Sequence, residues 1–160
     1  MTDCIELQSG TKISKESRIT DIKAIKLSSN ITICSNVTIN NTDQNQVQIG
    51  KYTFIKPNTE IKTPIHIGAF VLIGSNCVAE SKIIGNRVIV EDNVHLQSGS
   101  IIYECCIVKK DTIIPPKYIV PPFTEVSGVP GKNFTSRSLN FSYKQEIESE
   151  IRKLNLLGIS

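Results

Sequence analysis

Aliphatic residues recur at every sixth position along most of the chain. The series starts at Leu7 and runs to Ala79, with Asp43 as its one polar member, and after a shift of one residue it continues from Ile84 to Val126. Only 39% of all residues are hydrophobic, so chance would not produce so regular a series. Its members are Leu7, Ile13, Ile19, Ile25, Ile31, Val37, Asp43, Ile49, Ile55, Ile61, Ile67, Ile73, Ala79, Ile84, Val90, Leu96, Ile102, Val108, Ile114, Val120 and Val126.

A period of six matches neither the α-helix nor the simple alternation of a β-strand. It is typical of hexapeptide solenoids, in which each hexad forms a short strand and a turn of a parallel β-helix. We therefore predict an all-β domain from about Leu7 to Val126, with about seven three-sided coils. The recurring aliphatic residue should face the prism interior. A second, more confined interior position is predicted four residues later, at Thr53, Thr59, Val71, Cys77, Val88 and Val94.

The pattern changes at two places. The polar segment 40–46 should leave the prism as a loop, and the hexads stop at Lys132. We predict a β-helix domain over residues 1–132 and a tail over residues 133–160 that contains an α-helix. In that helix Ser142 and Gln145 fit a capping box, and Gly158 can end it. Its apolar side chains, at helical spacing, would either pack along a prism face or bind a partner: Ile147, Ile151 and Leu154.

Composition and charge exclude several classes of function. The net charge of +3 and the absence of Trp argue against nucleic-acid binding. The apolar runs are too short to span a membrane, and the first residues lack the pattern of a signal peptide. The five cysteines show no regular spacing, which favours packing residues in a reduced, cytoplasmic protein.

The segment 65–80 resembles the hexads of gamma-class carbonic anhydrases, whose metal is held by three histidines. At the matching positions this chain has Lys62, Ser75 and Glu80, and its two histidines, His66 and His95, lie elsewhere. A zinc site needs three protein ligands with a free lone pair, which a lysine ammonium lacks. We therefore expect no metal site.

The ending "IVPPFTEVSGVPGK" resembles the last coil of hexapeptide acetyltransferases, which use a histidine as general base. His95 is the one plausible candidate for that role. By strand alternation, however, His66 and His95 should both point outward. An acyltransferase remains the alternative function, although we expect neither catalytic residues nor a bound cofactor.

Three segments together resemble the dynactin subunit 5 family: "IELQSGTKISKES", "IHIGAFVLIGSNCV" and "IIPPKYIVPPFTEVSGVPG". The resemblance runs from Cys4 to Lys132 and does not include the tail from Asn133. The segment "AESKIIGNRV" also echoes dynactin subunit 6, which stays a lesser alternative. The resemblance implies a left-handed β-helix.

The resemblance also implies a non-enzymatic, cytoskeleton-associated role at the pointed end of dynactin's actin-like filament. Implied partners are a sibling β-helix subunit of the subunit 6 type as heterodimer, a subunit 4 type, an actin-related protein and cargo adaptors.

Prolines mark the corners of the closing coil, where they would stiffen the end of the prism. Phe123 follows one of these corners, so it would serve as an exposed interface anchor, or it would cover the open end of the prism or pack under the tail helix. The candidate interface residues are Pro116, Pro121, Pro122, Phe123 and Val129, with Ile147, Ile151 and Leu154 of the tail.

Overall fold

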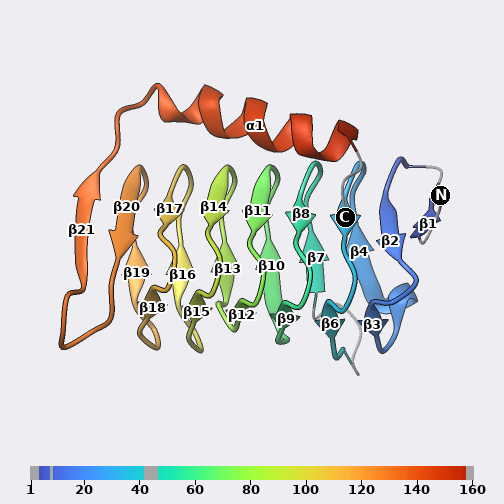
Figure 1. The fold of residues 1–160 in the computed structure, drawn as a ribbon, viewed down its shortest axis with the longest axis horizontal. Coiled ribbons are helices and arrows are strands. Elements are labelled where there is room, and N and C mark those ends of the chain that lie inside the picture. Colours follow the sequence, from blue (N-terminus) through green and yellow to red (C-terminus); the bar gives the residue numbers. More distant parts are fainter. Residues whose placement is uncertain (1–3, 8, 42–46, 158–160) are drawn as a thin grey trace.

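The computed structural model describes residues 4–7, 9–41 and 47–157, which form a left-handed parallel β-helix with one C-terminal α-helix (Figure 1). Three sheets, which we call sheets A, B and C, form the sides of a prism, and the chain crosses them in that order. The predicted fold class is confirmed. The two six-stranded sheets give six complete coils, slightly fewer than the seven expected.

The strands are short, as the hexad predicts. In spatial order, sheet A contains β1 (Cys4–Glu6), β2 (Lys12–Ser14), β5 (Thr32–Ile33), β8 (Phe54–Ile55), β11 (Val71–Ile73), β14 (Val88–Val90), β17 (Ile107–Val108), β20 (Thr124–Ser127) and β21 (Thr135–Ser138). Sheet B contains β3 (Arg18–Ile19), β6 (Thr38–Ile39), β9 (Glu60–Ile61), β12 (Val78–Ala79), β15 (His95–Leu96) and β18 (Ile113–Ile114). Sheet C contains β4 (Ile25–Leu27), β7 (Val47–Ile49), β10 (Ile65–Ile67), β13 (Ile83–Ile84), β16 (Ile101–Ile102) and β19 (Ile119–Val120).

From Ile13 onward the recurring aliphatic residues stack in columns inside the prism and form one hydrophobic core, whereas Leu7, the first of the predicted series, is exposed. On sheet A, for example, Ile55 pairs with Ile73 and Ile73 pairs with Val90, and all three side chains are fully buried. Each buried aliphatic side chain stabilises the fold by about 1.5–3 kcal/mol. The predicted second interior position is buried too, at Thr53, Thr59, Val71, Cys77, Val88 and Val94.

The predicted frame is correct at Ile13 and Ile19 but is wrong by two residues from Ile25 to Val37. Leu27, not Ile25, aligns with Ile49, because a 3₁₀ turn, η1 (Ile22–Ala24), lengthens the path between Ile19 and Leu27. The next strands follow the shifted frame, until a longer path between Ile39 and Ile49 restores it. The two insertions together add as many residues as one hexad contains. Counting every sixth residue along the sequence therefore does not reveal them. Ile25, Ile31 and Val37 are still buried, but at the second interior position, and Asp43 lies outside the described residues.

Each end of sheet A carries an antiparallel strand. β1 pairs with β2 at the N-terminal end, and β21 pairs with β20 at the other. β21 lies in the predicted tail, was not predicted from the sequence, and has all four of its residues exposed. Both strands cover the last parallel strand of the sheet, so they discourage the addition of further coils.

The helix α1 (Tyr143–Leu157) follows β21 and runs back along the prism toward its N-terminal end (Figure 1). The Asn140 Oδ1 atom accepts a 2.9 Å hydrogen bond from the Ser142 amide just before the helix. The capping contact shown here therefore comes from Asn140, two residues before the predicted Ser142. Gly158 lies outside the described residues. In the described part of the chain, α1 and η1 are both too short or too polar to cross a membrane.

Candidate assembly surface

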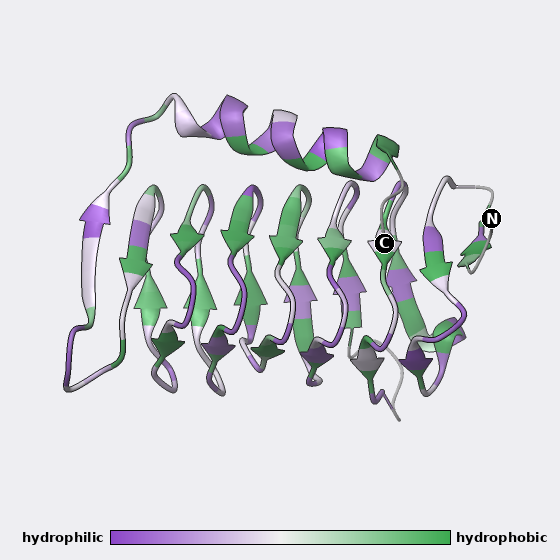
Figure 2. Cartoon of the chain, viewed as in Figure 1, coloured by the Kyte–Doolittle hydropathy of each residue, from purple (hydrophilic) through white to green (hydrophobic). Residues whose placement is uncertain are grey.

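Sheet A has its outer face covered by α1. The helix buries Ile147 and Ile151 against Phe54 and Leu72, and Cys34 completes this second apolar cluster. Figure 2 shows the corresponding amphipathic pattern, with hydrophilic residues on the side of α1 away from the prism. The helix therefore occupies one of the three prism faces.

Aromatic and charged residues at the corner between sheets C and A hold α1. Tyr52 and Phe70 have positive φ values of 56° and 57°, which are unusual for bulky side chains. Their rings stack with centroids 5.2 Å apart, and the Arg152 guanidinium lies 5.3 Å from each centroid. Arg87 extends the column and donates a 2.7 Å hydrogen bond from Nε to Glu148 of the helix. At this corner the strained backbone thus presents a docking column for α1.

The tail residues predicted as interface candidates pack within this chain instead. Ile147 and Ile151 are buried between α1 and sheet A, and Leu154 is partly buried in the same cluster. Of the two interpretations of the helix, packing along a prism face is the one that the structure shows. Ile147 and Ile151 are therefore not available to a partner while α1 is docked.

The candidates of the closing coil lie at its corners. Pro116, Pro121 and Pro122 are exposed in turns, and Val129 is half-buried. Phe123 is half-buried with a φ of 54°, and its ring meets that of Phe141 edge to face at 4.8 Å. Phe123 thus contacts the tail, whereas the ring of Phe141 is 77% exposed.

Sheet C carries an apolar row that was not predicted from the sequence. Its outward positions align from strand to strand, and the last three are Ile83, Ile101 and Ile119. Ile83 is 38% and Ile119 is 53% exposed, and Tyr103 beside them is 46% exposed. Exposed Pro121 follows β19 directly, so it borders the same surface. We call Ile83, Ile101 and Ile119 the isoleucine row.

The signal for this row was present in the sequence as aliphatic doublets such as Ile83–Ile84 and Ile101–Ile102. In a strand one member of each doublet must point outward. The same doublets on sheet A lie close to the tail, where Ile89 and Ile107 pack against the cluster under α1. Only the placement of α1 distinguishes the covered doublets from the exposed ones.

Sheet B has a mixed outer face that includes His95. Its Nε2 atom lies 2.5 Å from Glu80 Oε2, and Lys62 Nζ lies 3.7 Å from Glu80 Oε1. The hydrogen bond from His95 holds the pKa of Glu80 below its ordinary value of 4.5. Two positions that match metal-ligand histidines, Lys62 and Glu80, therefore form an ion pair, while Ser75 donates its amide to Asp92.

His66 is exposed on sheet C, as predicted, and therefore lies on a different prism face from His95. Across residues 4–7, 9–41 and 47–157, the structure brings no three His, Cys, Asp or Glu side chains together as a metal site would require.

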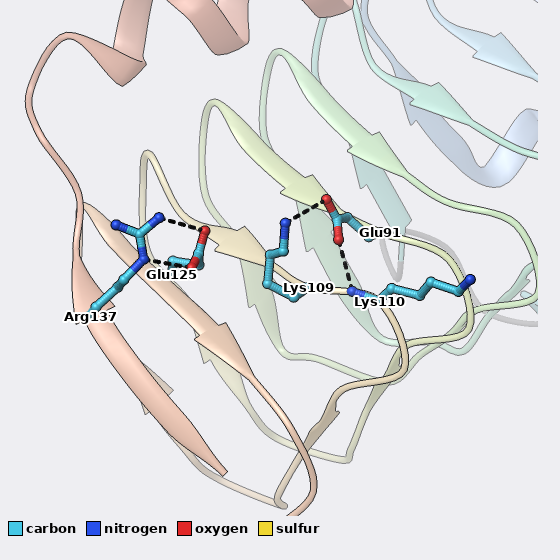
Figure 3. Close-up of polar contacts among 5 residues, drawn as sticks. All are labelled: Glu91, Lys109, Lys110, Glu125 and Arg137. Carbon is cyan, nitrogen blue, oxygen red and sulfur yellow. Dashed lines mark hydrogen bonds and ion pairs between the residues drawn. The ribbon is translucent and has the colours of Figure 1, made fainter. Parts of the chain in front are cut away.

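A groove of about 580 Å³ runs between the first half of α1 and the last coils of sheet A. Its floor is apolar, formed by residues such as Leu72, Ile89 and Ile107. Its rim carries two ion pairs, which Figure 3 shows. Glu125 accepts hydrogen bonds of 2.7 and 3.2 Å from Arg137. Glu91 accepts bonds from Lys109 Nζ at 3.3 Å and from the Lys110 amide at 2.9 Å.

The Glu91–Lys109 pair joins neighbouring coils, and the Glu125–Arg137 pair fixes β21 to β20. Because each carboxylate has a basic partner, these charges are largely neutralised within the chain. The groove therefore offers little net charge to a ligand.

Solved structures with a similar fold include several bacterial acyltransferases. A hexapeptide transferase family protein from Anaplasma phagocytophilum has a TM-score of 0.71 and 18% identity, over 92% of this chain and 90% of its own. The UDP-N-acetylglucosamine O-acyltransferase of Moraxella catarrhalis has a TM-score of 0.66 and 16% identity, over 85% of this chain and 56% of its own. At such identities the likeness establishes the fold alone. No curated protein sequence matches the chain.

The family comparison covers nearly the whole chain. The model of the family described as "Dynactin subunit 5" matches residues 1–153. The match extends beyond Lys132, where the resemblance read from the sequence ended, and includes β21 and most of α1. The chain therefore belongs to the dynactin subunit 5 family.

Proposed function

We propose that this chain is a non-enzymatic structural and adaptor subunit of the dynactin pointed-end complex in the cytoplasm. In this role it caps the actin-like filament and helps to link dynein–dynactin to cargo. Its proposed partners are a sibling β-helix subunit of the subunit 6 type as heterodimer, a subunit 4 type, the pointed-end actin-related protein and cargo adaptors.

The observation that carries the proposal is the isoleucine row on a prism face that α1 leaves open. Three aligned isoleucines with Tyr103 beside them make a flat apolar strip. Contiguous exposed apolar patches mark interaction sites in soluble proteins. Together with membership in the dynactin subunit 5 family, this strip supports assembly through sheet C.

The exposed corner residues Pro116, Pro121 and Pro122 extend the proposed contact at the C-terminal end of the prism, together with Val129. Phe123 would take part through its contact with Phe141, whose ring is largely open to a partner. We expect Phe123→Ala to weaken association while leaving the β-helix folded. A variant that unfolds instead would assign Phe123 to the core.

The test is affinity purification of the tagged chain from its native cell, with quantitative mass spectrometry of the dynactin subunits. We expect Ile101→Asp to reduce their recovery about 10-fold or more, because a carboxylate would be buried at the contact. The matched control is Ile113→Asp, which changes another half-buried outward isoleucine, on sheet B. Recovery of the chain without any dynactin subunit would contradict the proposal.

A second candidate function is an acyltransferase, favoured by the similar solved structures and by the pairing of His95 with Glu80. An imidazole oriented by a carboxylate is the arrangement that a general base needs. Calorimetry with acetyl-coenzyme A tests it directly. Binding at micromolar affinity that His95→Ala abolishes would favour the enzyme over the scaffold.

A further inference from the structure

We infer that the partner docked on sheet C carries acidic side chains at one end and apolar side chains at the other, and that the acidic end fixes its register along the prism. This inference rests on the proposed function, because it specifies the chemistry of the partner on the same face. It concerns the half of sheet C that lies N-terminal to the isoleucine row.

The outward positions of sheet C change in chemistry halfway along the prism. Lys26 aligns with Gln48, Gln48 with His66, and His66 with Ile83, the first member of the isoleucine row. Figure 2 shows this change as hydrophilic bands in the middle of β4, β7 and β10 and hydrophobic colour over β16 and β19. One flat face therefore has a polar half and an apolar half.

The polar half is basic and hollowed. Lys26, Lys51 and His66 line a groove of about 390 Å³ whose lining includes no acidic residue. Gly50 and Gly68 also line the groove, and their coils approach so closely that a Cβ atom on Gly50 would lie 2.5 Å from the Gly68 carbonyl carbon. Among the residues that the structure describes, neither Lys26 nor Lys51 has an ion-pair partner. Their charges are thus free to meet those of a partner.

An apolar row alone would not define where the partner sits. Neighbouring coils lie about 4.8 Å apart and repeat the same geometry, so a shift by one coil would place isoleucine where isoleucine was. Charges differ in this respect. An acidic group moved off the basic half loses its attraction, and like charges brought together weaken binding strongly. The two lysines therefore select one register and one direction.

The same argument excludes a symmetric contact between sheet C of this chain and sheet C of a second copy. A parallel arrangement would place Lys26 opposite Lys26, and an antiparallel one would place it near Ile119 at the far end of the sheet. Neither arrangement gives the lysines an anion. The complementary surface belongs to a different chain with acidic residues.

The experiment measures binding of the full chain to the second β-helix subunit proposed above, by surface plasmon resonance at 50 and 300 mM NaCl. We expect Lys26→Glu/Lys51→Glu to slow association about 10-fold at low salt and to flatten or reverse the salt dependence. Lys15→Glu/Lys153→Glu is the matched control, with two exposed lysines away from sheet C and the same change in net charge. Zero-length carboxyl–amine cross-linking should join Lys26 or Lys51 to an Asp or Glu of the partner.

The results separate the inference from the function on which it rests. If the sheet C double variant binds like the control, the acidic partner surface is wrong, whereas a loss of binding in Ile101→Asp would keep the isoleucine row as the contact. If Ile101→Asp also binds like the parent, docking on sheet C fails altogether. A homodimer of the parent in sedimentation that Ile101→Asp disperses would overturn the choice of a different chain.

Discussion

The Thr32 hydroxyl donates a 2.9 Å hydrogen bond to Asn155 Oδ1, across 123 positions of the sequence. Both residues are buried between sheet A and the last turn of α1. The Asn155 amide nitrogen also donates to the Tyr52 carbonyl and to the Ile151 carbonyl, at 3.0 Å each. One side chain thus connects the end of the tail to two early coils of the prism.

Replacing Asn155 should release this end of the helix. Asn155→Ala leaves the buried Thr32 hydroxyl without its acceptor, and we expect a loss of about 2–3 kcal/mol in the free energy of unfolding, measured with urea. Trypsin should then cleave faster after Arg152 and Lys153. The control Gln145→Ala changes an exposed residue of the same helix. Equal stability and equal cleavage in both variants would show that Asn155 does not anchor α1.

Two neighbouring isoleucines give a sharp test of the prism interior. Ile84 is fully buried, whereas Ile83 beside it is on the open face of sheet C. Ile84→Asp buries a carboxylate without a partner and should cost at least about 4 kcal/mol in the free energy of unfolding. Ile83→Asp should change stability by less than about 1 kcal/mol. Circular dichroism and urea unfolding distinguish the two, and similar stabilities would contradict the assigned direction of the side chains.

The cysteines should be unreactive in the folded protein, with one exception. Burial raises the pKa of the Cys34 thiol to about 12 and that of Cys106 to about 11, and it also raises the pKa of Cys77 and Cys105. Because the thiolate is the reactive species, all four should resist a disulfide reagent at pH 7.5. We expect about one equivalent of thiol, from Cys4, before unfolding and five equivalents in guanidinium. Rapid reaction of two or more native thiols would contradict this burial.

The Glu80–His95 pair should add a pH-dependent contribution to stability. The pKa of Glu80 is lower in the folded chain than its ordinary value of 4.5, so the folded state releases this proton more readily than the unfolded state. The contribution is therefore present above pH 4.5 and is lost as the pH falls toward the lowered pKa. Urea unfolding between pH 3 and 6 should show a shallower acid loss in Glu80→Gln and in His95→Asn than in the parent. Parallel curves for all three proteins would rule out this contribution.

The strand pairing of the early coils shows why the six-residue frame predicted for Ile25, Ile31 and Val37 was wrong although aliphatic residues still recurred at these positions. The insertions before Leu27 and before Ile49 compensate each other, so every sixth residue remains apolar except Asp43. Ile25, Ile31 and Val37 satisfied the count because a β-helix has two interior positions per strand, and either one accepts an aliphatic side chain. Only strand pairing could tell which of the two each residue fills.

The strand β21 and the docking of α1 could not be predicted for a different reason. The residues of β21, Thr135–Ser138, are polar and show no period, and they adopt a strand because β20 offers them an edge to pair with. The apolar stripe of α1 was visible, but three equivalent prism faces were open to it. Long-range contacts such as that of Arg152 with Tyr52 and Phe70 select sheet A.

The sequence by itself determined the solenoid, its interior and the presence of the helix, because these follow from a period that every coil repeats locally. The tertiary structure decided which surfaces remain open. Side chains of the same kind point outward from all three sheets, and their exposure depends on a helix that starts at Tyr143 and covers residues as distant as Thr32. The isoleucine row is available for assembly because α1 lies on sheet A and leaves sheet C uncovered.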